Sequence, residues 1–221
     1  MKLKKLVVLL SSLLASMHLS NAATFFVTNI GAGPGDTLYA DSNNVLLGSG
    51  FSAIGYFAST VLVADINTIG GLQNQLTLGS FTTVAFANDF TGGGIGDGYV
   101  SGSSVNVGNI TGADPLIGRS IYVITTNQSS LAAFASGSGT GNQVALVNFG
   151  TIQDDDPFPF IYNGNPVAPA TVVIGGSGSF IESSGGHLGN GSYSTLTLAI
   201  PEPSTLLLSA LGVLALLRRK R

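Results

Sequence analysis

Three adjacent carboxylates, Asp154 to Asp156, form the densest group of side chains in this sequence that could hold a metal ion. Neighbouring carboxylates repel one another, and a divalent cation bound by their oxygens would relieve that repulsion. In an extended strand, successive side chains point to opposite faces, so only Asp154 and Asp156 could share an ion there. Asp97, within the glycine-rich stretch Gly92–Gly98, is a second and isolated candidate for a calcium-binding turn. The competing interpretation, an acidic surface turn and a flexible loop, is the one we favour, so no resident cofactor is assigned and calcium is the alternative.

Groups that could catalyse a reaction are sparse. His187 is the only histidine after residue 22, and Glu182 is the only glutamate before residue 201. A serine hydrolase needs a base, a nucleophile and an orienting acid, and a glycosidase needs two carboxyl groups that flank the bond. No Gly-x-Ser-x-Gly elbow stands between a strand and a helix pattern. We therefore assign no catalytic residue and predict a non-enzymatic protein, with a secreted hydrolase as the weakest alternative.

A short row of aromatic residues offers a different chemistry. Phe158, Phe160 and Tyr162 alternate along the chain, so in a strand they would share one face. Such a row could stack on sugar rings, or it could be an ordinary sheet edge. A polysaccharide-binding module is therefore an alternative to a purely structural role.

The positive charge of the chain is concentrated at its ends. Seven of the eight basic residues lie in the first five and last four positions, which leaves Arg119 alone between residues 23 and 200. Ten carboxylates stand against it there, a formal charge of −9. A region with one cation cannot neutralise nucleic-acid phosphates, so DNA and RNA are excluded as partners. The absence of cysteine excludes disulfides and thiolate chemistry as well. Cations and neutral polymers such as exopolysaccharide remain as partners.

The elements that would position these residues are strands. Segments rich in β-branched and aromatic residues recur between Gly, Asn, Asp and Ser, which is the strand signature. Only 65–75 and 129–134 resemble helical turns, and 91–98, 136–141 and 175–191 resemble loops. The pattern predicts an all-β fold, an antiparallel β-sandwich or jelly-roll-like domain over residues 23–200. The expected strands are Thr24–Asn29, Ile54–Ala64, Gln75–Leu78, Phe81–Ala87, Tyr99–Val107, Arg119–Thr126, Gln143–Phe149, Pro169–Gly175 and Tyr193–Ile200.

Residues 1–22 have the pattern of a secretory signal peptide. Lys2, Lys4 and Lys5 precede the apolar run Leu6–Leu14, and Ser20-Asn21-Ala22 is a small-x-small cleavage site. Cleavage between Ala22 and Ala23 by signal peptidase, after passage through the Sec translocon, is the expected processing. The domain would then lie between an N-terminal signal helix and a C-terminal transmembrane helix.

Residues 201–221 have three parts in a fixed order. Pro201, Glu202, Pro203, Ser204 and Thr205 come first, then an apolar run to Leu217, then Arg218, Arg219, Lys220 and Arg221. The apolar run has no polar face, so it predicts a short transmembrane helix over 204–217 that anchors the chain in the membrane. The basic cluster would hold the C-terminus in the cytoplasm. With little linker after residue 200, the domain would lie close to the bilayer.

This order and spacing resemble the PEP-CTERM sorting tail of Gram-negative bacteria. The resemblance covers about a tenth of the chain and implies recognition by the membrane protease exosortase, through the motif Pro201–Thr205. It also implies transient anchoring in the inner membrane, followed by release or transfer to the cell surface or the exopolysaccharide matrix. It lends neither fold nor activity to residues 23–200. The function expected is that of an exported, non-catalytic structural protein of the surface or matrix.

Overall fold

A computed structural model describes residues 23–28, 37–91, 97–108, 116–137, 141–152, 161–163, 171–182 and 191–200. The predicted signal peptide (1–22), the predicted transmembrane helix (204–217) and the whole sorting tail (201–221) lie outside these residues.

The centre of the fold is a five-stranded antiparallel sheet with the strand order β4-β3-β6-β7-β9. Its middle strand, β6, is the most completely buried of the five, since all its residues except the first are buried. Because successive side chains point to opposite faces, Ile121 and Val123 enter one hydrophobic core while Tyr122 and Ile124 enter another. The sheet is therefore covered on both faces. Its strands are β3 (Phe51–Phe57), β4 (Phe81–Ala87), β6 (Ser120–Thr126), β7 (Val144–Thr151) and β9 (Thr171–Ile174).

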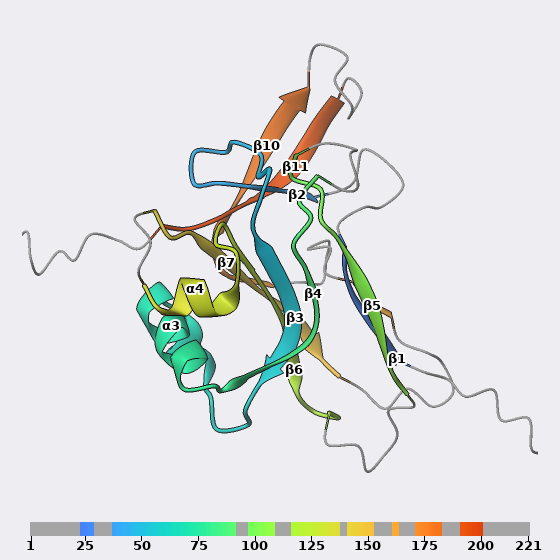
Figure 1. The fold of residues 1–221 in the computed structure, drawn as a ribbon, viewed down its shortest axis with the longest axis vertical. Coiled ribbons are helices and arrows are strands. Elements are labelled where there is room, and N and C mark those ends of the chain that lie inside the picture. The colour runs from blue at the N-terminus through green and yellow to red at the C-terminus, as the bar shows by residue number, and fades with distance from the viewer. Residues whose placement is uncertain are drawn as a thin grey trace, which may run out of the picture.

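Two smaller sheets of three strands each accompany the central sheet, with the orders β5-β1-β8 and β10-β11-β2. In each of them one pair is antiparallel and the other, β1 with β8 or β11 with β2, is parallel. Figure 1 shows β1 and β5 on one side of the central sheet and the helices on the other. The strands are β1 (Ala23–Thr28), β2 (Thr37–Ala40), β5 (Ser101–Gly108), β8 (Ile161–Asn163), β10 (Gly176–Glu182) and β11 (Gly191–Thr197).

Three short helices cover the other face of the central sheet: α2 (Val63–Ile66), α3 (Ile69–Thr77) and α4 (Leu131–Ala135). Side-chain caps begin the last two, since the Thr68 hydroxyl accepts from the Gly71 N–H at 3.1 Å and the Ser130 hydroxyl from the Ala133 N–H at 3.0 Å. Their buried residues join one core cluster with side chains of β3, β6, β7 and β9. That cluster consists of Phe57, Ile66, Leu72, Tyr122, Ile124, Phe134, Val144, Leu146 and Ile174.

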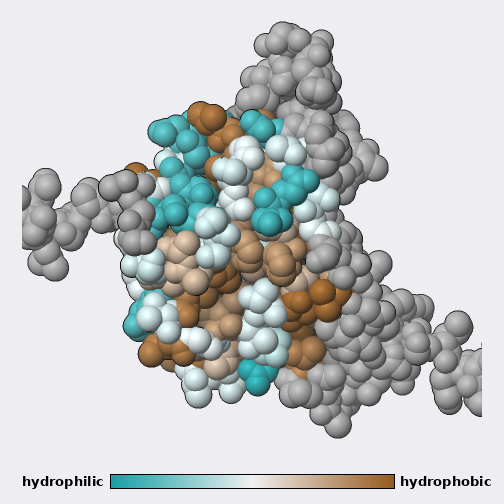
Figure 2. Space-filling model, in the orientation of Figure 1, coloured by the Kyte–Doolittle hydropathy of each residue, from teal (hydrophilic) through white to brown (hydrophobic). Residues whose placement is uncertain are grey.

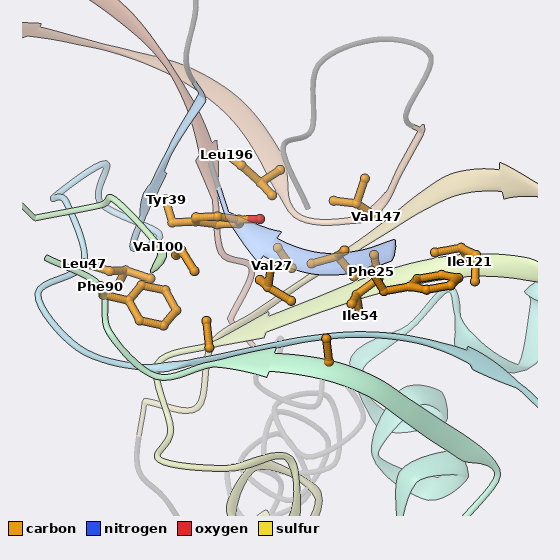
Figure 3. Close-up of a cluster of buried hydrophobic side chains, with 14 of the residues drawn as sticks. Phe25, Val27, Tyr39, Leu47, Ile54, Phe90, Val100, Ile121, Val147 and Leu196 are labelled. Atoms are coloured by element: carbon orange, nitrogen blue, oxygen red, sulfur yellow. The ribbon is translucent and has the colours of Figure 1, made fainter. Parts of the chain in front are cut away.

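The larger core lies between the central sheet and the two smaller sheets. Figure 3 shows side chains from β1, β2, β3, β6, β7 and β11 meeting there, with the Tyr39 ring beside Leu196 and the Phe90 ring beside Leu47. The rings of Tyr39 and Phe90 meet edge to face, with centroids 6.1 Å apart. This core connects segments from both ends of the described chain.

The prediction of a β-rich fold with mainly antiparallel pairing is confirmed, and several finer predictions are corrected. Gln75–Leu78 is not a strand: it is the last turn of α3 and its C-cap, where Leu76 packs on the helix-side core. The strand expected over Ile54–Ala64 ends at Phe57, and α2 begins within that range. The loop expected over 175–191 contains β10, which pairs with β11 along its whole length.

None of the helices in these described ranges is long and apolar enough to cross a membrane.

Candidate functional site

The chain leaves the described fold through a segment that is hydrogen-bonded on both sides, residues 198–200 following β11. The Leu198 N–H donates to the Ala40 carbonyl oxygen at 2.9 Å, which extends the pairing of β11 with β2. Ala199 turns to the other side, where its N–H donates to the Val144 oxygen at 2.8 Å and its oxygen accepts from the Val144 N–H at 3.0 Å. The exit segment therefore joins the β10-β11-β2 sheet to the central sheet.

The side chains of the exit segment anchor it further. Leu196 and Leu198 are 2% and 1% exposed and belong to the larger core, whereas Ala199 packs against the helix-side core. Ile200, the next residue, is 49% exposed. The transition from a fully packed chain to an exposed one thus takes place within two residues.

A cavity of about 510 Å³ lies beside the point of exit. Three segments meet at it, namely the start of α3, the end of β9 and the exit segment, and no lining residue carries a charge. Its lining residues are Asn67, Thr68, Ile69, Gly70, Gln73, Ile174, Ala199 and Ile200.

A buried polar atom lies at the same edge of the central sheet. Asn142 precedes β7 by two residues, is 3% exposed, and its Oδ1 has no hydrogen-bond partner. A buried acceptor without a partner costs about 1–3 kcal/mol. The segment just before β7 therefore leaves one buried hydrogen-bond acceptor without a partner, whereas the backbone of β7 itself is paired with β6.

A second hollow, of about 300 Å³, surrounds Arg119, the one cation between residues 23 and 200. One guanidinium nitrogen of Arg119 donates to the Phe57 carbonyl oxygen at 3.2 Å, and the guanidinium lies over the Tyr56 ring, 5.2 Å from its centroid. Hydroxyl groups of Ser59, Ser120 and Tyr122 belong to residues of the same lining. Burial raises the pKa of Tyr122 above 10.0, and a hydrogen bond with Ser120 lowers it in part. We call this hollow the Arg119 groove.

Three of the aspartates in the described ranges form turns. The Asp41 carboxylate accepts from the N–H groups of Asn43 and Val45 at 2.8 and 2.9 Å. The Asp65 carboxylate accepts from the Leu62 N–H at 2.8 Å and so begins α2. Asp89 accepts from both the N–H and the hydroxyl of Thr91, each at 2.8 Å. These carboxylates satisfy backbone donors that would otherwise lack partners, and the sequence analysis gave them no role.

The metal candidates are only partly within the described chain. Asp97 is exposed and its carboxylate packs on the backbone of Gly48, where an added Cβ would lie 3.2 Å from Oδ1. Within the ranges that the structure describes, no three His, Cys, Asp or Glu side chains gather to hold a metal ion. Asp97 therefore belongs to no such group there, while Asp154 and Asp156 lie outside the described residues.

The other candidates lie partly or wholly outside the described residues. Glu182 ends β10, and His187 lies outside the described residues, so the hydrolase alternative stays untested. Tyr162 belongs to β8, whereas Phe158 and Phe160 lie outside the described chain. Ala23 begins β1, so the predicted cleavage after Ala22 would leave this strand whole. The cleavage itself stays a prediction.

A β-rich domain thus ends in a segment clamped between two sheets, directly before the Pro-Glu-Pro sequence. Residues 199–221 match the PEP-CTERM protein-sorting motif, and the chain is a protein with a PEP-CTERM sorting domain. No curated protein and no solved structure matches the chain. The motif implies export, recognition by exosortase and sorting to the cell envelope or surface.

The matched region begins earlier than the sequence analysis placed it. Ala199 and Ile200 belong both to the sorting motif and to the folded domain. The motif is therefore attached to the domain without a linker. In the sequence the first local signal of the tail is Pro201, the start of the Pro-Glu-Pro motif, whereas the pairing of Ala199 with Val144 is seen only in the fold.

Proposed function

We propose that this chain is a non-catalytic structural protein of the cell surface or exopolysaccharide matrix of a Gram-negative bacterium. It would enter the Sec pathway through residues 1–22, stay in the inner membrane through residues 204–217, and then be handed over by exosortase. The sorting motif, fused to a rigid domain at Ala199, is the observation that carries this proposal.

The use of the charged side chains supports a structural role. Asp41, Asp65 and Asp89 cap turns of the fold, and Arg119 lies on Tyr56 and donates to a backbone oxygen. These three carboxylates, which acid–base catalysis could otherwise employ, are thus engaged in building the domain.

Removal of residues 201–221 tests the sorting step. The deletion leaves Ala199 and its pairing with Val144 in place, so the domain keeps its last hydrogen bonds. We expect the shortened chain to move from the envelope or surface to the periplasm or the medium, measured by fractionation and immunoblotting. An unchanged distribution would contradict exosortase sorting of this protein.

Dosage distinguishes a structural protein from a secreted enzyme. In a strain that lacks this protein, we expect the cohesion of the matrix to recover in proportion to the amount of protein resupplied. An enzyme turns over many substrate molecules, so trace amounts would suffice. Full recovery at trace dosage would contradict the structural role and favour the hydrolase alternative.

The Arg119 groove favours a second candidate function, polysaccharide binding. Its lining combines hydroxyl groups with an aromatic ring and an arginine, the groups that hydrogen-bond and pack on sugars. The groove would hold part of a polysaccharide chain that passes over the surface.

A bulky substitution tests this candidate. Ser59 is exposed at the groove, so Ser59→Trp should fill the groove without disturbing the core. Thr83→Trp on the exposed side of β4 is the matched control. If the groove binds polysaccharide, retention of the full chain on polymer extracted from the producing cells should fall about tenfold in Ser59→Trp alone, a loss of ~1.4 kcal/mol. Equal retention of both variants would exclude the groove.

A further inference from the structure

We infer that the surface around the exit cavity, formed by the start of α3, the end of β9 and Ile200, lies on the bilayer interface while the tail is anchored. We call this surface the exit face. The inference rests on the anchored stage of the proposed function and adds to it the orientation of the domain. The partner is the boundary between lipid headgroups and acyl chains of the bilayer that holds the tail.

The length of the connection limits how far the domain can stand from the membrane. Only Pro201, Glu202 and Pro203 separate Ile200 from the predicted span at 204–217. Four Cα–Cα steps cover at most ~14 Å when fully extended. The headgroup layer accounts for about 5–8 Å of this on each side of the membrane. The Ile200 backbone therefore lies within roughly one side-chain length of the headgroups.

Detaching the exit segment from the fold would lengthen this connection, but it would cost free energy. Ala199 makes two backbone hydrogen bonds with Val144, and Leu198 is bonded to Ala40 and buried in the core. Releasing them would expose the Leu198 side chain and the ends of two sheets to water. The residues beside Ala199 thus stay near the bilayer together with it.

The composition of the exit face suits an interface between lipid and water. The cavity lining presents Ile69, Ile174 and Ile200 among amide and hydroxyl groups, with no charged side chain. The Ile200 side chain, which is 49% exposed, carries this apolar character to the surface. In Figure 2, the part of this view over α3 and α4 is mostly pale or apolar, while hydrophilic residues gather above it. Exposed apolar groups gain free energy when they enter the interface.

The charge distribution points the same way. A domain of formal charge −9 is repelled by anionic lipid, so its contact surface is expected where carboxylates are fewest. Two described acidic residues come near the exit face: Asp65 is two positions before Asn67, and Asp41 follows Ala40, which pairs with the chain just before the exit segment. Both carboxylates accept hydrogen bonds from backbone N–H groups of their own turns. Neither lines the cavity.

Single tryptophans can test this orientation because the chain contains none. Asn67→Trp and Gly70→Trp are two exposed reporters on the exit face, because both positions line the cavity and an added Cβ at Gly70 would meet nothing within 4 Å. The second protects the test if the first fails to fold. Phe86→Trp is the control: Phe86 is 48% exposed on β4, four strand spacings from Ala199 across the sheet, or ~19 Å. Leu211→Trp, inside the predicted span, reports on anchoring.

Each variant would be purified from membranes of cells that lack exosortase and returned to phosphatidylcholine vesicles with brominated acyl chains. We expect strong quenching of Leu211→Trp and quenching on the order of twofold greater for Asn67→Trp than for Phe86→Trp, since interfacial groups lie ~5–10 Å into the boundary. Quenched Leu211→Trp with equal signals from Asn67→Trp, Gly70→Trp and Phe86→Trp would overturn the orientation and leave the anchoring intact. Unquenched Leu211→Trp would overturn the anchoring, and the orientation with it.

Discussion

Tyr39 places a phenol in the larger core, where it is 1% exposed. Its hydroxyl is hydrogen-bonded with Thr125 and Ser52, and the hydroxyls of those two residues lie 2.8 Å apart. Burial raises the pKa of Tyr39 to about 12, and the two hydrogen bonds lower it in part. The neutral phenol is therefore the form that this core accepts.

We predict that the free energy of unfolding falls as the pH rises from 10 towards 12. In this window the unfolded chain has lost the Tyr39 proton while the folded chain retains it, so ionisation favours the unfolded state. A rise of the pKa from 10.0 to about 12 corresponds to about 3 kcal/mol. Below pH 9 the phenol is protonated in both states, so its ionisation should not change the stability there.

Denaturant unfolding of the full chain at pH 8 and pH 11 measures this effect. Tyr39→Phe should be less stable than the natural chain at pH 8 because it leaves Ser52 and Thr125 without the phenol. It should nevertheless lose less stability between the two pH values. An identical loss in both chains would show that Tyr39 does not titrate in this range. Part of the slope should remain, since the pKa of Tyr122 is raised as well.

At the scale of the element, α3 begins with two adjacent glycines in different surroundings. An added Cβ at Gly70 would meet nothing within 4 Å, whereas one at Gly71 would collide with the Asp65 carbonyl oxygen and crowd the Thr68 hydroxyl that caps the helix. The second glycine lets α2 and α3 approach each other closely, and the first has no such role.

Gly70→Ala should therefore stabilise the fold by about 0.5–1 kcal/mol, because alanine loses less backbone entropy in a helix. Gly71→Ala should destabilise it by about 1–3 kcal/mol through overpacking, despite the same gain in helix propensity. Thermal unfolding of the two variants, compared with the natural chain, provides the measurement. A stabilised Gly71→Ala would mean that α2 and α3 separate without cost.

The sequence predicted elements well where the signal is local. Phe81–Ala87 is the strand expected, and the β-branched run after Arg119 became the buried strand β6. The strand predicted over Gln75–Leu78 was wrong, because tertiary packing and not local composition determines the structure there. Leu76 packs against the helix-side core, and the segment continues α3. Strand β10 was missed because its Gly/Ser-rich start resembles a loop, and its pairing with β11 supplies the order.

Of the candidate functional features, only those formed by contiguous residues could be predicted from the sequence. The sorting tail was predictable because its three parts are contiguous in sequence, and the match to residues 199–221 confirms it. The exit cavity and the Arg119 groove were not predictable, since each collects residues from distant segments. Arg119 was singled out as a lone cation, but its position over Tyr56 depends on how β3 and β6 pair.

At the scale of the whole molecule, the charge is divided between segments. The full chain carries a formal charge of −3, while residues 23–200 carry −9, and the compensating cations lie in the two terminal segments. The carboxylates of Asp41, Asp65 and Asp89 are tied to backbone donors, but they still repel one another through the domain. Self-repulsion should therefore limit the stability of the domain at low salt.

We expect the melting temperature of the full chain to rise by a few degrees between about 10 mM and 1 M sodium chloride, since the screening length falls from ~30 Å to ~3 Å. About 5 mM calcium at matched ionic strength should add nothing further, although extracellular modules bind calcium at ~10⁻⁴–10⁻³ M. An extra rise that disappears in the double variant Asp154→Asn, Asp156→Asn, but persists in Asp97→Asn, would contradict this and locate a calcium site at the aspartate triplet. Sodium screens all carboxylates alike, whereas a bound ion stabilises only the folded state that forms its site.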